Sequence, residues 1–376
     1  MNVHEFVKRN KEGLLDLLKE LCAIPAPSGM EQARAAYCKA WLEQAGAKGV
    51  YTDGAQNVIF PFNCENSRSI TVFVAHTDTV FPDTEPMPYA DDGVRIHAPG
   101  VGDDTASLAV LLYVAKYFIE NGAEALDGVM FVCNSCEEGL GNLRGTKELF
   151  RNFEGRIGRF ISFDSDLSTI VDRCVGSHRY RVRIQTEGGH SFNSFGNRNA
   201  IAELAKLIGQ IYEIKVPQKE GTKTTYNVGV AEGGTSVNTV AQSASMLCEY
   251  RSDDSECLEI MRQAFWKIFD GAKAQGTDIH VEIIGERPCM GAVDACEIEK
   301  MTKICEEILK QTAHMTVQKH SGSTDCNVPL SLGIPALCVG VYRGGGAHTR
   351  EEWVEKASLP VGLEAGIRIA EALLKA

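Results

Sequence analysis

The chain has 376 residues, of which 44% are hydrophobic and 23% are charged, and its formal net charge at pH 7 is −12. This composition is typical of a folded globular protein and excludes a disordered or fibrous chain. The acidic balance, without any basic run, argues against nucleic acid and anionic membrane surfaces as partners. The length exceeds that of most single cores, so we expect two domains.

The sequence gives three indications of cellular location. The first residues, MNVHEFVKRNKEGLLDLL, have mixed charge and helical periodicity and lack the apolar core of a signal peptide. The apolar stretches of the chain are all too short to span a bilayer. The thirteen cysteines are odd in number and scattered, which favours reduced thiols over a disulfide framework. We therefore expect a cytoplasmic protein.

The first part of the chain predicts alternating helices and strands. Leu14, Leu18 and Leu21 recur at helical spacing, and the segment IPAPSGME breaks that helix. Ser28 could cap a second helix that runs through Trp41. Strands are expected near 70–75, 128–135 and 158–164, with helices near 105–120 and 143–150. This alternation predicts an α/β fold whose sheet is doubly wound and mostly parallel.

The pattern changes after residue 175. Residues 178–188 alternate polar and apolar side chains, as a half-exposed antiparallel strand does. The further elements up to residue 287 predict a smaller α+β module, namely helices near 200–214 and 256–274 and strands near 224–230, 243–251 and 278–284. The first pattern then resumes, with a helix at 296–311, a strand at 334–341 and a helix at 360–374. We therefore expect a catalytic domain formed by residues 1–175 and 288–376, with an inserted α+β lid and dimerisation domain at 176–287.

Acids and histidines follow several of the predicted strands. His76 and Asp78 follow the strand at 70–75, Glu137 and Glu138 follow the strand at 128–135, and Asp164 follows the third. The glycine turn GVGDDTAS places Asp103 and Asp104 before a helix, and GGGAH places His348 after the strand at 334–341. Ligands bind at the carboxyl edge of parallel sheets, so these groups could converge there. Imidazoles and carboxylates suit zinc, cobalt or manganese.

Each of these motifs also has a plain structural interpretation. An acid after a strand is commonly a helix cap or a turn former, and an isolated Asp103–Asp104 pair is typical of an N-cap. A His-x-Asp spacing is frequent by chance, and paired glutamates usually form a solvated edge. The metal interpretation rests on five such groups occurring in order at one predicted sheet edge.

The chain resembles the co-catalytic di-zinc family of peptidases and amidohydrolases that contains peptidase T, glutamate carboxypeptidase, aminoacylase and succinyl-diaminopimelate desuccinylase, with the peptidase T-like members most similar. The resemblance covers nearly the whole chain. It is carried, in the family's order, by AHTDTV, GVGDDTAS, CEEGLG, FDSD, GGHSFNSFGN, EGGTSVN and GGGAH. Thr105 and Ser107 depart from the lysine and glycine that many relatives carry there, which leaves the subfamily open.

The resemblance implies two divalent ions, zinc above all, with cobalt or manganese as alternatives. His76 and Asp164 would hold one ion and Glu138 and His348 the other, with Asp103 bridging both. Asp166 is the alternative to Asp164.

The resemblance also assigns two catalytic roles. Asp78 would orient His76. Glu137 would be the general base acting on a metal-bridging hydroxide.

The resemblance further implies that the inserted domain forms a homodimer. His190 would then polarise the scissile carbonyl in the partner's site, while Asn238 and Arg251 would hold the amide and the terminal carboxylate of the substrate. The plain alternatives are a turn residue for His190 and an exposed salt bridge for Arg251.

The expected function is that of a metal-dependent hydrolase that cleaves a peptide bond of short peptides, as an aminopeptidase, tripeptidase or carboxypeptidase does. The alternative with the same mechanism is an N-acyl amino acid deacylase. An alternative of another class is a metal-free binding or assembly protein on this scaffold.

Overall fold

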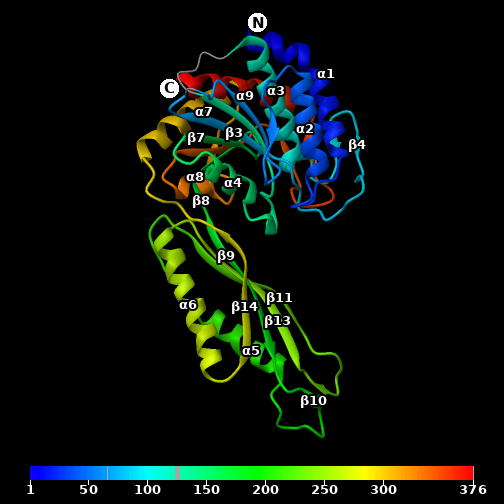
Figure 1. Cartoon of the computed structure of the whole chain (residues 1–376), viewed down its shortest axis with the longest axis vertical. Coiled ribbons are helices and arrows are strands. Elements are labelled where there is room, and N and C mark those ends of the chain that lie inside the picture. The colour runs from blue at the N-terminus through cyan, green and yellow to red at the C-terminus, as the bar shows by residue number, and fades with distance from the viewer. Residues whose placement is uncertain (66, 123–127, 376) are drawn as a thin grey trace. The chain divides into compact units, whose positions relative to one another are not determined.

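The computed structural model describes residues 1–65, 67–122 and 128–375. The chain divides into two compact units, one formed by Met1–Cys174 with Gly291–Ala376 and the other by Val175–Met290 (Figure 1). The second unit is therefore an insertion within the first.

The first unit contains an eight-stranded sheet with the order β1-β2-β6-β3-β7-β16-β8-β15. The pairs β3–β6, β3–β7, β7–β16 and β8–β15 are parallel, and the other three are antiparallel. The strands are β1 Tyr51–Thr52, β2 Val58–Phe62, β3 Ile70–His76, β6 Gly128–Asn134, β7 Ile157–Phe163, β8 Thr169–Cys174, β15 Gln318–Gly322 and β16 Ala336–Val339. The predicted α/β fold with a mostly parallel sheet is confirmed.

The centre of this sheet is buried. Every residue of β3 and β6 is buried, and Phe73 stacks on Phe131 with ring centroids 5.9 Å apart. Such β-branched and aromatic runs suit strands that are covered on both faces. In Figure 1, α3 and α9 lie above strands β3 and β7, and α4 and α8 lie below them. The helices of this unit are α1 Val3–Cys22, α2 Gln32–Gln44, α3 Ser107–Asn121, α4 Arg144–Asn152, α7 Ala295–Ala313, α8 Asn327–Ser331 and α9 Ser358–Lys375.

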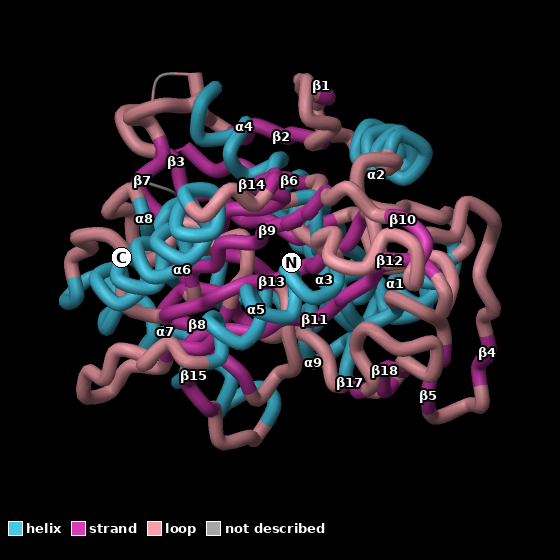
Figure 2. The backbone as a smooth tube through the Cα atoms, turned by 90° about the horizontal axis from the view of Figure 1, so that it is seen from below, coloured by secondary structure: helices cyan, strands magenta, loops and turns pink. Residues whose placement is uncertain are grey.

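A small second sheet joins two segments that are far apart in the chain. Its order is β17-β18-β5-β4, and Figure 2 shows these short strands side by side. The strands are β4 Ala90–Asp91, β5 Arg95–His97, β17 Gly344–Gly345 and β18 Trp353–Glu355. Arg95 lies 3.7 Å from the ring centroid of Trp353, and Arg350 forms two hydrogen bonds to Asp83 of 3.0 and 2.7 Å. This sheet thereby fixes the two ends of the segment that carries His348.

The second unit is a four-stranded antiparallel sheet, β11-β13-β9-β14, with two helices packed on one face. Tyr180, Val182 and Ile184 of β9 point into that face, as the alternating pattern predicts. A two-stranded ribbon, β10–β12, extends from it. The elements are β9 Gly176–Gln185, β10 Gly189–His190, α5 Ala200–Tyr212, β11 Thr224–Gly233, β12 Thr239–Val240, β13 Ser243–Ser252, α6 Ser255–Ala274 and β14 Asp278–Arg287.

No helix in the described part of the chain combines the length and the apolar character needed to cross a membrane.

Hydrogen bonds link three ring side chains in the second unit, those of His178, Tyr250 and Tyr180. The ring nitrogen Nδ1 of His178 lies 2.6 Å from the hydroxyl of Tyr250, which lies 2.9 Å from the hydroxyl of Tyr180. A neutral imidazole can accept the Tyr250 hydroxyl hydrogen at Nδ1, whereas a protonated one cannot. Burial lowers the pKa of His178 below its ordinary value, so the folded unit favours the neutral ring.

Acidification is therefore expected to destabilise this unit. Because the pKa of His178 is lower in the folded than in the unfolded chain, the unfolded chain binds the extra proton as the pH falls below about 6.5. The loss can reach about 1.4 kcal/mol per pH unit. Thermal unfolding followed by circular dichroism between pH 7.5 and 5.5 measures it, with His178→Gln as the matched control. Equal pH dependence of the two proteins would contradict this assignment.

Candidate metal centre

The candidate ligands come from neighbouring strand ends of the first unit. His76 is the last residue of β3, and Asp164 follows directly after β7. Glu137 and Glu138 lie in the turn after β6, which is the other parallel neighbour of β3. Parallel neighbours end at the same sheet edge, so the topology brings these side chains together. Asp103 lies in the turn before α3, and His348 lies between β17 and β18.

Two groups of three side chains share Asp103. His76, Asp103 and Asp164 form one, and Asp103, Glu138 and His348 form the other. In each group, one ligand atom of each residue lies within 4.8 Å of those of the other two. Oδ1 of Asp103 lies 3.1 Å from Nε2 of His76, while its Oδ2 lies 3.0 Å from Nε2 of His348. The two oxygens of one carboxylate thus face two different histidines.

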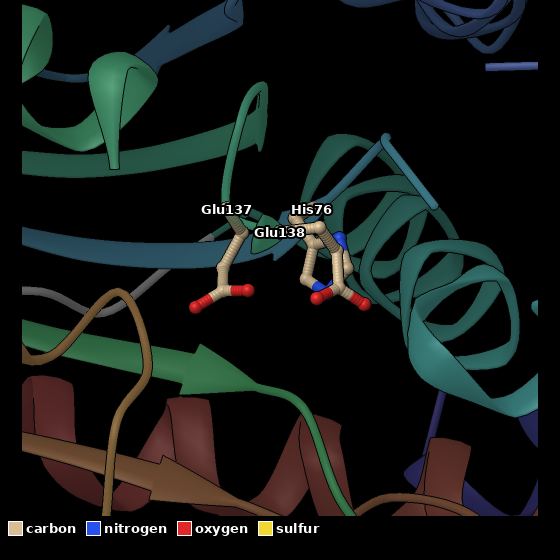
Figure 3. Close-up of side chains that lie close together, drawn as sticks. All are labelled: His76, Glu137 and Glu138. Atoms are coloured by element: carbon tan, nitrogen blue, oxygen red, sulfur yellow. The ribbon is translucent and has the colours of Figure 1, made fainter. Parts of the chain in front are cut away.

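The side chain of Glu137 lies on the same side of the turn as that of Glu138, next to these groups. His76, Glu137 and Glu138 form a third cluster of the same size, and Figure 3 shows both carboxylates directed to the same side, next to the imidazole. Consecutive residues of a regular strand would point to opposite faces. The backbone is not a regular strand here, since Cys136, just before the two acids, adopts a left-handed conformation with φ of +59°.

The charges of the centre perturb one another strongly. Burial opposes ionisation of Asp103, but hydrogen bonds with His348 and His76 outweigh it and lower the pKa of that carboxyl. Contacts with Asp103 and Glu138 raise the pKa of His348 to about 10. Burial, followed by the field of Asp103, raises the pKa of Asp164 to about 7. Without cations, the carboxyl group of Asp164 and the imidazole of His348 therefore retain protons near neutral pH.

The donor set fits a pair of divalent cations. Oε1 of Glu138 is buried and lies 3.1 Å from Nε2 of His348, yet it accepts no hydrogen bond from any described residue. An orphaned carboxylate oxygen beside an imidazole nitrogen is typical of ligands that face a shared cation. Two imidazoles and three carboxylates suit zinc, cobalt and manganese.

Three other predicted acids lie around the centre. Oδ1 of Asp78 lies 3.4 Å from Nδ1 of His76, on the side of the ring away from Asp103. Asp104 accepts the backbone N–H of His76 at 2.9 Å, so it supports the strand end. The carboxylate of Asp166 accepts the N–H and the hydroxyl of Ser168 in the next turn. Among the described residues the candidate groups contain Asp164 and not Asp166.

The side chain of Ser28 does not serve as the helix cap that the sequence suggested. Helix α2 starts at Gln32, and its N-cap residue, Glu31, makes no side-chain capping bond. The hydroxyl of Ser28 instead donates to Oδ2 of Asp78 at 2.6 Å. The prediction was wrong because the helix begins four residues after Ser28, so its Oγ is not placed to accept an N–H of the first turn, and its hydroxyl donates to a buried carboxylate instead.

Sequence reasoning missed two buried carboxylates that hold the loops of the centre. Glu352 accepts the N–H groups of Gly100, Gly102 and Asp103 at 2.8, 2.9 and 2.8 Å. Glu31 accepts the N–H of Cys136, one residue before Glu137. Both acids are at most 1% exposed. No periodicity marks such residues, and the one available signal was an acid next to a glycine-rich motif.

Replacing Glu352 by alanine is expected to destabilise the fold. The substitution leaves three N–H groups of the Asp103 turn without their acceptor, and each unmet buried group costs about 1–3 kcal/mol. We expect the free energy of unfolding to fall by about 3 kcal/mol or more in urea denaturation. Glu352→Gln, which keeps one oxygen acceptor, should lose less. A Glu352→Ala protein within about 1 kcal/mol of the wild type would refute the assignment.

The three predicted substrate-binding residues lie in the second unit. His190 is exposed, and its Nδ1 lies 3.3 Å from the N–H of Phe192. Asn238 is close to it in the adjoining loop, because its carbonyl accepts the N–H of Ser191. Arg251 is part-buried on β13 and donates to Glu249 at 2.8 Å. These contacts match the plain interpretations of a turn residue and a salt bridge, and the substrate roles stay predictions.

Known proteins are similar to this chain in fold and in sequence. The aminopeptidase PepT of Bacillus cereus superimposes with a TM-score of 0.74 and 22% identity, covering 96% of this chain and 98% of its own. A tripeptidase of Staphylococcus aureus gives a TM-score of 0.74 and 23% identity, covering 98% and 99%. A candidate succinyl-diaminopimelate desuccinylase (DapE) of Mycobacterium tuberculosis is 23% identical over 93% of this chain and 96% of its own length.

The sequence also matches one family along most of its length. Residues 72–372 match the pattern of the peptidase family M20/M25/M40. This range includes all the residues of the metal centre described above, from His76 to His348. The chain belongs to the peptidase family M20/M25/M40.

Proposed function

We propose that the protein is a hydrolase that cleaves the amide bond of short peptides with the help of two divalent cations. The observation that carries the proposal is the pair of three-residue groups that share Asp103, with Glu137 beside them. The aminopeptidase and tripeptidase with similar folds support peptides as the substrate class.

The residues that would hold the cations are His76 and Asp164 for one, Glu138 and His348 for the other, and Asp103 for both. Bound there, the cations would supply water of lowered pKa and polarise the substrate carbonyl. A cation also replaces the protons that this centre otherwise holds, which is why its affinity should fall at acidic pH.

Glu137 would act as the general base. Its carboxylate lies in the cluster with His76 and Glu138, so it can reach a water at the centre. It would take a proton from that water and then deliver it to the departing amine nitrogen. Glu137 is 5% exposed, and this low exposure keeps bulk water from competing for the proton.

Asp78 would orient His76. The backbone carbonyl of Asp78, 3.0 Å from Nδ1, and its carboxylate at 3.4 Å would stabilise the tautomer that leaves Nε2 free as a ligand. The same carboxylate accepts the N–H groups of Glu137 and Glu138 at 3.0 and 2.9 Å. Asp78 would thus fix a ligand and the base together.

The second unit would bind the substrate. We propose Arg251 for a terminal carboxylate, Asn238 for the amide, and His190 as a hydrogen-bond donor to the scissile carbonyl of a partner's site. The last role requires a homodimer, which analytical ultracentrifugation tests directly.

An N-acyl amino acid deacylase is the second candidate. It uses the same centre, and the similarity to the candidate desuccinylase over 93% of this chain favours it. The two functions differ in the acyl group and not in the bond that breaks.

One experiment tests both functions. Purified protein is loaded with zinc, cobalt or manganese and assayed on di- and tripeptides and on N-acyl amino acids. Hydrolysis of peptides above N-acyl amino acids in kcat/KM supports the first function, and the reverse order supports the second. Two metal ions per chain and activity lost on chelation are expected in both cases. A protein that binds no metal and hydrolyses neither class would instead be a binding or assembly protein.

A further inference from the structure

The turn that carries Glu137 adopts an unusual backbone conformation. Cys136 lies in the left-handed region, which residues other than glycine seldom occupy. This conformation occurs directly before two consecutive acids that face one centre. Interactions around the turn must therefore favour it over the ordinary strand continuation.

Two buried carboxylates bind three consecutive N–H groups of this turn. The N–H of Cys136 donates to Oε1 of Glu31 at 3.1 Å, and those of Glu137 and Glu138 donate to the two oxygens of Asp78. The thiol of Cys136 also donates to Oε1 of Glu31 at 3.1 Å. Asp78 also contacts His76, a predicted ligand. Among the described residues, Glu31 has no contact of this kind with any predicted ligand.

Glu31 is itself well anchored. It is fully buried, and its backbone carbonyl accepts the N–H of Ala35, which ties it to the start of α2. Its Oε1 also accepts the N–H of Gly29 at 2.8 Å. The neighbouring Ser28 donates to Asp78, so one short segment contacts both carboxylates that bind the turn. A rigid helix end therefore determines where the N–H of Cys136 must lie.

We propose that Glu31 is a positioning residue that holds the Cys136–Glu138 turn and thereby aims Glu137 at the centre. The proposal rests on the proposed function only in naming Glu137 as the base. Because a displacement of about 1 Å at a reacting group can cost 10²-fold in rate, loss of one such bond should be visible in kcat.

The test compares Glu31→Ala with Glu31→Gln in the metal-loaded protein. Glutamine keeps an oxygen at Oε1, and its nitrogen replaces Oε2, which accepts no hydrogen bond from the described residues. The matched control is Glu43→Ala, an exposed glutamate at the other end of α2. The measurements are kcat and KM, bound metal per chain, and amide hydrogen exchange of a peptide covering residues 134–138.

We expect Glu31→Ala to lower kcat by about 10- to 100-fold with KM within about twofold and metal content unchanged. Amide exchange at residues 136–138 should rise by about tenfold or more. Glu31→Gln and Glu43→Ala should stay within about threefold of the wild type in both readouts. If Glu31→Ala does not fold, Glu31→Asp replaces it, since its carboxylate is drawn back by about one C–C bond, about 1.5 Å.

Several results would overturn the proposal. Unchanged exchange in Glu31→Ala means that Glu31 does not hold the turn. Faster exchange with unchanged kcat means that the turn does not aim the base. A Glu31→Gln protein as impaired as Glu31→Ala means that the acceptor oxygen is not what matters. A wild type that hydrolyses no substrate refutes the proposed function, and the exchange comparison still decides whether Glu31 holds the turn.

Discussion

Glu137→Gln is expected to lower kcat by about 10³-fold while leaving the bound metal unchanged. Glutamine has almost the volume of glutamate but cannot take a proton at neutral pH. Glu137 lies in a cluster with Glu138 and His76, yet it is absent from the two groups that share Asp103. Its loss should therefore remove the proton transfer and spare the cations.

The measurement pairs steady-state kinetics with metal analysis of the same samples. Glu138→Gln is the informative comparison, because it changes the neighbouring residue in the same turn. It should lose activity together with about one metal ion per chain, since Glu138 belongs to the group with Asp103 and His348. Retained turnover in Glu137→Gln at full metal content would remove this residue from its proposed role.

Much of the architecture was predictable because local pattern and tertiary structure agree. The run from Ile70 to Ala75 is β-branched, aromatic and apolar, and it forms the fully buried β3. The side chains at the carboxyl ends of β3, β6 and β7 then meet by topology alone, since parallel neighbours end at one edge. This is why the sequence alone groups His76, Glu138 and Asp164.

The small sheet of β4, β5, β17 and β18 was not predictable in the same way. Its strands have two or three residues, too few for any periodicity to show. It nevertheless fixes the segment of His348, a residue that is half-exposed and has a φ of +65°. The sequence suggested His348 through the order of motifs, whereas its position depends on pairing between segments about 250 residues apart.

The buried acids Glu31 and Glu352 escaped prediction for another reason. Each acts on backbone N–H groups of a distant loop, and a sequence does not show which amides lack a partner. Together with Asp78 and Asp104 they form a layer of carboxylates that bind backbone near the centre. The centre thus contains acids with two tasks, those that face the shared groups and those that hold the loops.

Asp103→Ala should lose both metal ions and lower activity by at least about 10³-fold, because Asp103 is the one residue common to the two ligand groups among the described residues. Asp103→Asn keeps the volume but not the negative charge, so it should bind both ions more weakly by more than about 100-fold.

Variants that change a residue of only one ligand group provide the contrast that makes the Asp103 result specific. Asp164→Ala affects only the group with His76, and His348→Ala affects only the group with Glu138, so each should retain about one ion per chain. Metal analysis after gel filtration, with zinc titration by calorimetry, measures the stoichiometry. If Asp103→Ala kept two ions, or if the single-group variants lost both, the two groups would not be separate sites joined by one carboxylate. The shared oxygens of Asp103, at 3.1 and 3.0 Å from the two histidines, would then need another explanation.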